Sequence, residues 1–362
     1  MKRGLNVAIR VAVVTVGLAW AMGAASGQGR PPLAAVEDGW IPPRMPWGAP
    51  DLQGIWSGKT MTPLERPERF AGREFLTDDE VAVLEREATT EPGRDARAAK
   101  GTHVDLEGAY NDVFTHRATN VVRTRRTSLI VDPPSGRVPS LTPQGRQRFE
   151  AAAAAGVTEI TGQFDTHYPL APERAAADHP EDRDPDRCLG VTVPPLSASA
   201  AFRRIVQAPE HLTIYYENSN AGGAYRTIWL DGRPHLPAHI RQWLGHSVGR
   251  WEDDTLVVET TNFTDQTYAV HGQPLVVGLQ ENQRLVEHFT RAGPDLIMYR
   301  VTVDDPTMFT RPWTIEIPLT KQSDQENLIF ETACHEGNYA LTSILAGARL
   351  EEARETTRDG SR

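Results

Sequence analysis

The feature that most constrains the fold is a series of short, strand-like runs that begins near residue 202. These runs are rich in Val, Ile, Thr and aromatic residues, and turn residues separate them: FRRIVQAPEHLTIYYEN, AYRTIWLDG, SVGRWE, TLVVETTNF, QRLVEHFTR, DLIMYRVTVDD, TRPWTIEIPLTK and NLIFETACHEG. Short strands at such regular spacing predict an antiparallel meander. About eight strands can close into an up-and-down barrel, which removes the sheet edges and can hold one small ligand. A two-sheet sandwich is the alternative.

A Gly-x-Trp triplet occurs twice, at Gly54–Trp56 and at Gly249–Trp251. Gly-x-Trp at the mouth of a strand is the usual opening of lipocalin-type barrels. We therefore predict a mainly β protein, an antiparallel lipocalin-like (calycin-type) barrel with an irregular, partly helical N-terminal extension. A long stretch without a regular meander follows the first copy, so we assign it to the extension. The second copy lies within the strand series, before a tight turn at 252–255, and Trp251 is expected to plug the core.

The N-terminal half contains many prolines, which cannot lie inside a long sheet. Two helices are expected there, one capped by Thr77 with Glu80 and one capped by Thr142 with Pro143 in its first turn. A third, short helix from Pro237 to Gly245 would interrupt the strands and serve as a lid or a plug. The predicted organisation is a signal peptide at 1–28, an arm with two helices and a connector at 29–187, a barrel at 188–350 and a disordered tail at 351–362.

The first residues have the pattern of an export signal. Lys2 and Arg3 precede an apolar run from Val11 to Ala25, and small residues follow it. The run is shorter than the roughly 20 residues of a membrane span, although an uncleaved anchor is the alternative. We therefore expect a periplasmic or secreted protein whose mature form has no stable membrane span. The net charge of −10 argues against a nucleic-acid partner.

Two cysteines, Cys188 and Cys334, can form a disulfide in an exported compartment, and two buried free thiols are the alternative. The sequence contains no Gly-rich phosphate loop, no Cys-x-x-Cys pair and no Gly-x-Ser-x-Gly elbow. His235 and His239 have zinc-like spacing, but Pro237 places His235 before the helix and no protease-type Glu accompanies them. We therefore expect neither a metal ion nor a cofactor.

Three residues of the strand series are candidates for acid–base chemistry. His335 and Glu336, beside Cys334 at a strand end, can act as general acid or base, or can simply anchor the final turn. His235 can serve as a neutral base near the pocket, because its ordinary pKa is close to neutrality, or can hydrogen-bond to backbone at the barrel rim.

Other charged residues are candidate ligand-binding groups. Arg311 shares a face with Trp313 and can offer a cation beside an aromatic wall to a carboxylate, enolate or phenolate. Alternatively, Arg311 stacks on Trp313 and closes one end of the barrel. Glu287 lies between Leu285 and Phe289, and apolar neighbours would raise its pKa. The opposite facing would turn Val286 and His288 inward instead.

A further cluster of polar side chains precedes a predicted strand in the arm. Its members are Tyr110, His116, Arg117, Arg123, Arg125 and Arg126. Tyr110 and Arg125 are candidate ligand-binding residues and His116 is a candidate catalytic residue. Arginines at alternate positions can line a pocket mouth where the arm meets the barrel. Ordinary ion pairs with the acidic connector are the alternative.

Several blocks of the chain resemble a large group of exported bacterial proteins with a lipocalin-like β domain: PWGAPDLQGIWS, LDGRPHLP, GRWEDDTLVVETTNF and ACHEGNYAL. The resemblance implies export and a β domain behind an extended N-terminal segment, and it assigns no catalytic residue. We predict an exported barrel protein that binds a small hydrophobic or aromatic molecule. As an enzyme it would be a cofactor-independent lyase, isomerase or hydrolase. The alternatives are a non-catalytic carrier and a structural envelope protein with a filled barrel.

Overall fold

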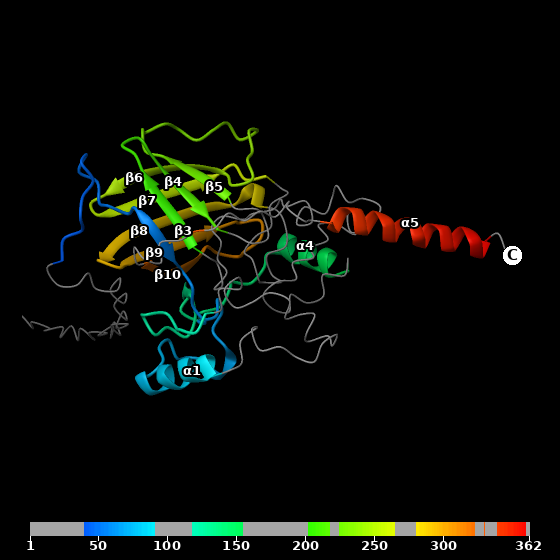
Figure 1. The fold of residues 1–362 in the computed structure, drawn as a ribbon, viewed down its shortest axis with the longest axis horizontal. Helices are drawn as coiled ribbons and strands as arrows, with labels where there is room; N and C mark the ends of the chain where they lie inside the picture. Colours follow the sequence, from blue (N-terminus) through cyan, green and yellow to red (C-terminus); the bar gives the residue numbers. More distant parts are fainter. Residues whose placement is uncertain are drawn as a thin grey trace, which may run out of the picture. The chain divides into compact units, whose positions relative to one another are not determined.

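The computed structural model describes residues 40–90, 118–154, 202–217, 224–264, 280–322, 329 and 339–359 (Figure 1). The strands are β1 (Gly54–Ser57), β2 (Ile130–Asp132), β3 (Phe202–Gln207), β4 (His211–Tyr216), β5 (Ala224–Trp229), β6 (His246–Glu252), β7 (Thr255–Thr261), β8 (Arg284–Gly293), β9 (Leu296–Asp304) and β10 (Trp313–Lys321). The helices are α1 (Asp78–Thr90), α4 (Pro143–Ala154) and α5 (Ala340–Asp359), with 3-10 turns at Glu68–Phe70 and Gln280–Asn282.

All ten strands of the described residues belong to one sheet, and nine of them close into a barrel. The order is β1-β3-β4-β5-β6-β7-β8-β9-β10, and β1 pairs back onto β10, while β2 adds to β10 outside the closed ring. The prediction of a mainly β protein with a closed barrel is therefore confirmed.

The barrel is mixed, not purely antiparallel as expected. Strands β5 and β6 run parallel, with Ile228 opposite Ser247. Parallel neighbours need a crossover of a dozen or more residues, and the irregular segment 230–245 supplies it. The short helix expected in this segment is wrong, since only turns form. Its backbone instead binds Asn262, whose Nδ2 donates to the carbonyl oxygens of Leu236, Pro237 and Ile240 at 3.1, 3.1 and 3.0 Å.

The first Gly-x-Trp copy is a barrel strand, which corrects its assignment to the extension. Strand β1 pairs with β3 along its whole length, and Trp56 and Ser57 face Lys321 and Thr320 of β10. Trp56 is fully buried in the core, whereas Trp251 is only partly buried against it. The turn between β6 and β7 is the predicted tight hairpin, with Glu252 opposite Thr255.

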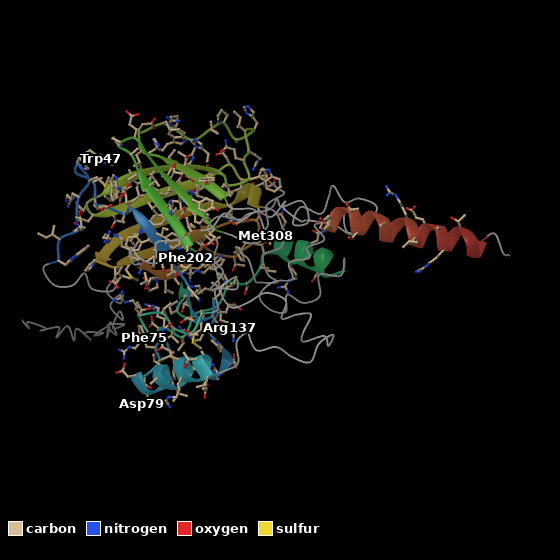
Figure 2. The ribbon with its side chains drawn as sticks, viewed as in Figure 1. Trp47, Phe75, Asp79, Arg137, Phe202 and Met308 are labelled. Carbon is tan, nitrogen blue, oxygen red and sulfur yellow. The ribbon has the colours of Figure 1, made fainter. Side chains whose placement is uncertain are left out.

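Both predicted helix starts in the N-terminal half are present. Thr77 and Glu80 form the reciprocal capping box of α1, with Thr77 N donating to Glu80 Oε2 at 2.8 Å. Thr142 Oγ1 accepts from Gly145 N at 2.9 Å and caps α4. The described side chains of α1 and of the barrel are drawn in Figure 2, where Asp79 marks α1 and Phe202 marks β3.

The expected disordered tail at 351–362 is wrong for its first nine residues, because α5 extends through Asp359. Its sequence is rich in Ala, Leu, Glu and Arg, which are strong helix formers. Among the described residues, no helix is long and apolar enough to cross a membrane.

The core lies inside the barrel, because alternate residues of each strand point inward. On β8, Leu285, Glu287, Phe289 and Arg291 are buried, while the residues between them are partly exposed. The inward residues of β9 and β10 are also buried: Ile297, Tyr299, Val301, Val303, Trp313, Ile315, Ile317 and Leu319.

Candidate functional site

A buried ion pair occupies the barrel interior, where a ligand was expected. Arg226 of β5 and Glu287 of β8 are 2% and 0% exposed. Arg226 Nη1 donates to Glu287 Oε1 at 3.0 Å and Arg226 Nη2 donates to Oε2. The other guanidinium contacts are Nε to Ser247 Oγ at 2.9 Å, Nη1 to Tyr216 Oη at 3.2 Å and Nη2 to Thr260 Oγ1 at 2.9 Å. All five guanidinium donors are therefore satisfied by protein.

The electrostatics of this cluster follow from its burial. Burial lowers the pKa of Arg226, but the adjacent Glu287 carboxylate more than compensates and raises it above its usual range. Burial raises the pKa values of the two neighbouring tyrosines, Tyr216 and Tyr299. The hydroxyl Oη of Tyr299 donates to Glu287 Oε1 at 2.9 Å. Glu287 does face inward, with Val286 and His288 on the other face. Its neighbours are not only apolar as expected, because Arg226 and Tyr299 bind its carboxylate.

His235 lies in a second cluster, on the outer face of the barrel. Its Nδ1 is 3.2 Å from Nδ1 of His246, and its Nε2 is 3.4 Å from Oε1 of Glu259. Arg284 binds the other oxygen of Glu259. Burial, followed by the nearby His235 and Arg233, lowers the pKa of His246. Sequence reasoning missed His246, although its spacing from His235 across a turn-rich segment was a usable signal.

The two imidazoles can share one proton between their facing Nδ1 atoms, and Glu259 orients His235 from the opposite side. His239, by contrast, is exposed. Among the described residues, no group of three His, Cys, Asp or Glu side chains is arranged to hold a metal ion.

Arg311 and Trp313 do not form the expected cation and aromatic wall. The Arg311 side chain is half exposed and binds both carboxylate oxygens of Asp132, at 2.9 and 2.8 Å. Trp313 is fully buried and packs edge-to-face on Phe309, with ring centroids 5.6 Å apart. Strand β10 begins only at Trp313, so the alternation that would have aligned the two residues does not reach Arg311.

The remaining candidates lie outside the described residues and stay predictions. They are the catalytic candidates His116, His335 and Glu336, the ligand-binding candidate Tyr110, and the cysteines Cys188 and Cys334 of the expected disulfide.

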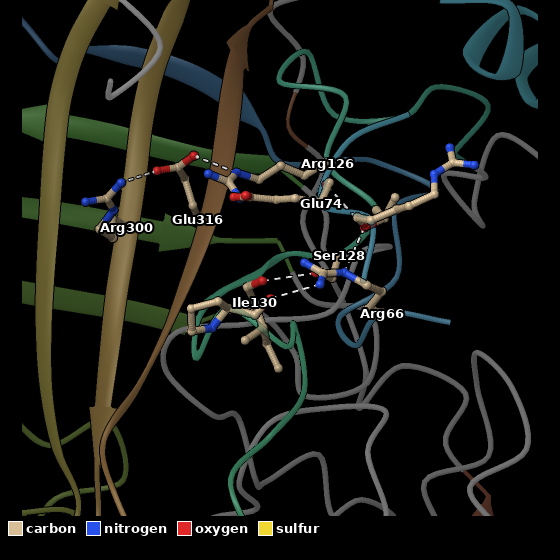
Figure 3. Close-up of polar contacts among 10 residues, drawn as sticks. Arg66, Glu74, Arg126, Ser128, Ile130, Arg300 and Glu316 are labelled. Atoms are coloured by element: carbon tan, nitrogen blue, oxygen red, sulfur yellow. Dashed lines mark hydrogen bonds and ion pairs between the residues drawn. The ribbon is translucent and has the colours of Figure 1, made fainter. Parts of the chain in front are cut away.

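The arm is joined to the outer face of β10 by a row of charges (Figure 3). Glu316 is 4% exposed and binds Arg300 of β9 at 2.5 Å, while Arg126 Nε lies 3.7 Å from its other oxygen. Arg126 also binds Glu74. Glu316 N donates to the Leu129 carbonyl oxygen at 2.9 Å. These contacts fix the position of the segment that carries Arg123 and Arg125.

A cavity of about 480 Å³ lies beside these contacts between the arm and β10. Its lining residues are Ser57, Lys59, Thr60, Val81, Glu85, Thr119, Asn120, Val121, Val122, Arg123, Arg125, Pro318, Thr320 and Gln322. One wall is β10, which pairs with β2 at Thr314 and Ile315 and with β1 at Thr320 and Lys321. Pro318 lies between these pairings, where its missing N–H costs no hydrogen bond to either strand.

The other walls of the cavity are residues 57–60, α1 and the segment 119–125. Hydrogen bonds hold them together, because Glu85 Oε1 accepts from Val121 N at 3.1 Å and Thr60 Oγ1 donates to Asn120 O at 3.0 Å. The structure thus places Arg125 at a cavity between arm and barrel. The described acidic partners of Arg123 and Arg125 are Asp295 and Asp78, which lie outside the connector 157–187.

No family model, curated protein or solved structure matches this chain. Functional conclusions therefore rest on the geometry of the cavity and of the two polar clusters.

Proposed function

We propose that this chain is a small-molecule-binding protein whose ligand site is the cavity between the arm and the outer face of β10. The observation that carries this proposal is the cavity itself. Its volume of about 480 Å³ lies within the range of small-molecule pockets. Hydroxyl, amide and charged side chains from four separate segments converge on it, which is how a binding site obtains both affinity and orientation.

The barrel interior offers less support for a ligand site at its described positions. Side chains fill the inward positions of β8, β9 and β10, and the donors of Arg226 are already satisfied. An apolar ligand inside the barrel stays a prediction. Binding is also a better account than catalysis, because a catalytic site needs its acid and base to converge. Among the candidates with described positions, His235 and Glu287 do not converge, because His235 lies on the outer face of the barrel and Glu287 lies inside it.

Two finer features belong to the same proposal. Lipocalin-type barrels place an arginine near the tryptophan of their first Gly-x-Trp strand. A lipocalin-like barrel is therefore supported by Trp56 of β1, because the guanidinium of Arg291 lies over its ring, 4.8 Å from the centroid. Export to the periplasm or the medium is supported by the pattern of Lys2, Arg3 and the apolar run at 11–25. Both agree with the resemblance to exported bacterial proteins.

A thermal-shift screen of the purified protein tests the proposal, with sugars, sugar acids, phosphate esters, phenolics and terpenoids as probes. Thr320→Trp fills the cavity from an exposed position on β10 and should abolish any shift seen with the wild type. Val206→Trp is the matched control, because Val206 is 51% exposed on strand β3 and does not line the cavity.

The control should retain the wild-type shift. A ligand that stabilises both variants equally would place its site elsewhere. A panel without any shift would contradict the proposed function.

A further inference from the structure

We infer that the cavity takes a small polar molecule bearing a carboxylate or phosphate group, an inference that rests on the proposed function. The charges that line the cavity carry it. Lys59, Arg123 and Arg125 contribute three positive charges, against the single carboxylate of Glu85. The whole chain has a net charge of −10, so the excess of cations among the lining residues runs against the overall charge balance, and Asp295 and Asp78 pair with the two arginines at its edge. A concave, positively charged site attracts anions and excludes cations.

The two arginines are available to a ligand because their present partners hold them weakly. Arg123 binds Asp295 with side chains 50% and 54% exposed, and Arg125 binds Asp78 with side chains 49% and 88% exposed. Ion pairs between such exposed side chains contribute little to stability. An anion inside the cavity can therefore replace Asp78 or Asp295, and the planar guanidinium suits the two oxygens of a carboxylate or phosphate.

The backbone at Arg125 also favours a binding role. Its φ is +57°, a left-handed backbone conformation that residues other than glycine rarely adopt. Two hydrogen bonds fix it, from Arg125 N to Val122 O at 2.7 Å and from Leu76 N to Arg125 O at 2.8 Å. Strained backbone of this kind is often found at ligand clamps. Here it holds the Arg125 side chain at the cavity wall.

The rest of the lining suits a ligand body that has both hydroxyl groups and apolar faces, as a sugar ring does. Thr119, Asn120, Thr320 and Gln322 offer hydroxyl and amide groups, whereas the apolar contribution comes mainly from Val81, Val121, Val122 and Pro318. A hydroxylated acid or a sugar phosphate combines an anionic group with such a body.

Calorimetric titration with glucuronate, glucose 6-phosphate and neutral glucose tests this inference in the full-length protein. The charged sugars should bind at least about tenfold more tightly than glucose, and added salt should weaken their binding. Arg125→Gly removes the cation and also suits the positive φ, so the variant should stay folded. It should weaken binding of the charged sugars by about 10- to 100-fold.

Asp253→Gly is the matched control, because Asp253 has a φ of +51° at the β6–β7 hairpin, outside the cavity lining. Its affinity for the charged sugars should equal that of the wild type. Asp78→Asn releases Arg125 from its partner and should strengthen anion binding.

The outcomes separate the two proposals. If glucose binds as tightly as glucuronate and both lose affinity in Thr320→Trp, the inference of an anionic ligand is wrong and the cavity remains the binding site. Charged-sugar binding that is unchanged in Arg125→Gly would also overturn the inference. If neither these sugars nor any compound of the thermal-shift panel binds the wild type, the proposed function and the inference of an anionic ligand both fail.

Discussion

Arg226 and Glu287 lie where the strands of the barrel exclude water, and each neutralises the charge of the other. Removing ions from water is expensive, so such a pair adds little net stability compared with apolar side chains. The full set of hydrogen bonds around Arg226 and the Tyr299 hydroxyl makes the pair tolerable. Loss of one member would leave the other charge buried without a partner.

We therefore expect Glu287→Ala to lower the free energy of unfolding by about 3–5 kcal/mol. The double variant Arg226→Met with Glu287→Met should be closer to the wild type than the single variant is, because it leaves no unpaired charge. Denaturant unfolding of the wild type, the double variant, Glu287→Ala and the two single variants Arg226→Met and Glu287→Met measures this. A double variant as unstable as the sum of the two single changes would argue against the coupling.

At this scale the sequence predicted part of the cluster. The apolar residues on either side of Glu287 indicated its inward facing correctly. Its partner was not identified, because Arg226 lies on a strand 61 positions away and meets Glu287 only across the closed barrel. An arginine at the inward position before Ile228 was the available signal.

At the scale of elements, the crossover 230–245 is the least regular part of the described barrel and is held by specific contacts. Asn262 binds three of its carbonyl groups, and His235 meets His246 and Glu259. The lowered pKa of His246 shows that its surroundings favour the neutral imidazole. The other charged groups near this contact are Glu259, Arg233 and Arg284.

This predicts a pH-dependent stability. Because the folded-state pKa of His246 lies below its unfolded value of 6.5, the unfolded chain takes up a proton first as the pH falls. The contribution of His246 is thus fully present above pH 6.5 and is lost as the pH falls toward the folded-state pKa. Urea unfolding between about pH 8 and about pH 5 should show a smaller decline in His246→Gln than in the wild type. Equal declines would contradict this account.

The elements that were predicted correctly have local causes. The capping box of α1, the Thr142 cap of α4 and the hairpin at 252–255 depend on residues a few positions apart, which the sequence displays directly. The parallel pairing of β5 with β6 depends on where the chain goes after residue 230, and no local signal shows it. The expected helix from Pro237 failed because tertiary hydrogen bonds to Asn262 override a weak local propensity.

At the scale of the whole molecule, a strand from the N-terminal half closes a barrel whose other strands lie much later in the sequence. β1 pairs with both β3 and β10, and this closure brings the arm alongside the outer face of β10. The cavity is built at that junction, from residues between Ser57 and Gln322. Sequence analysis anticipated Arg125 at a junction of arm and barrel, but not which strand would form the opposite wall.

Hydrogen exchange of the backbone amides, with and without glucuronate at saturation, tests whether the cavity is the ligand site. The ligand should slow exchange in three of the segments that meet at the cavity, namely α1 around Glu85, residues 119–125 and the end of β10 near Thr320. Exchange at the inward-facing centre of the barrel, around Arg226 and Glu287, should not change. Protection confined to the barrel centre, with none at the three cavity segments, would contradict the account.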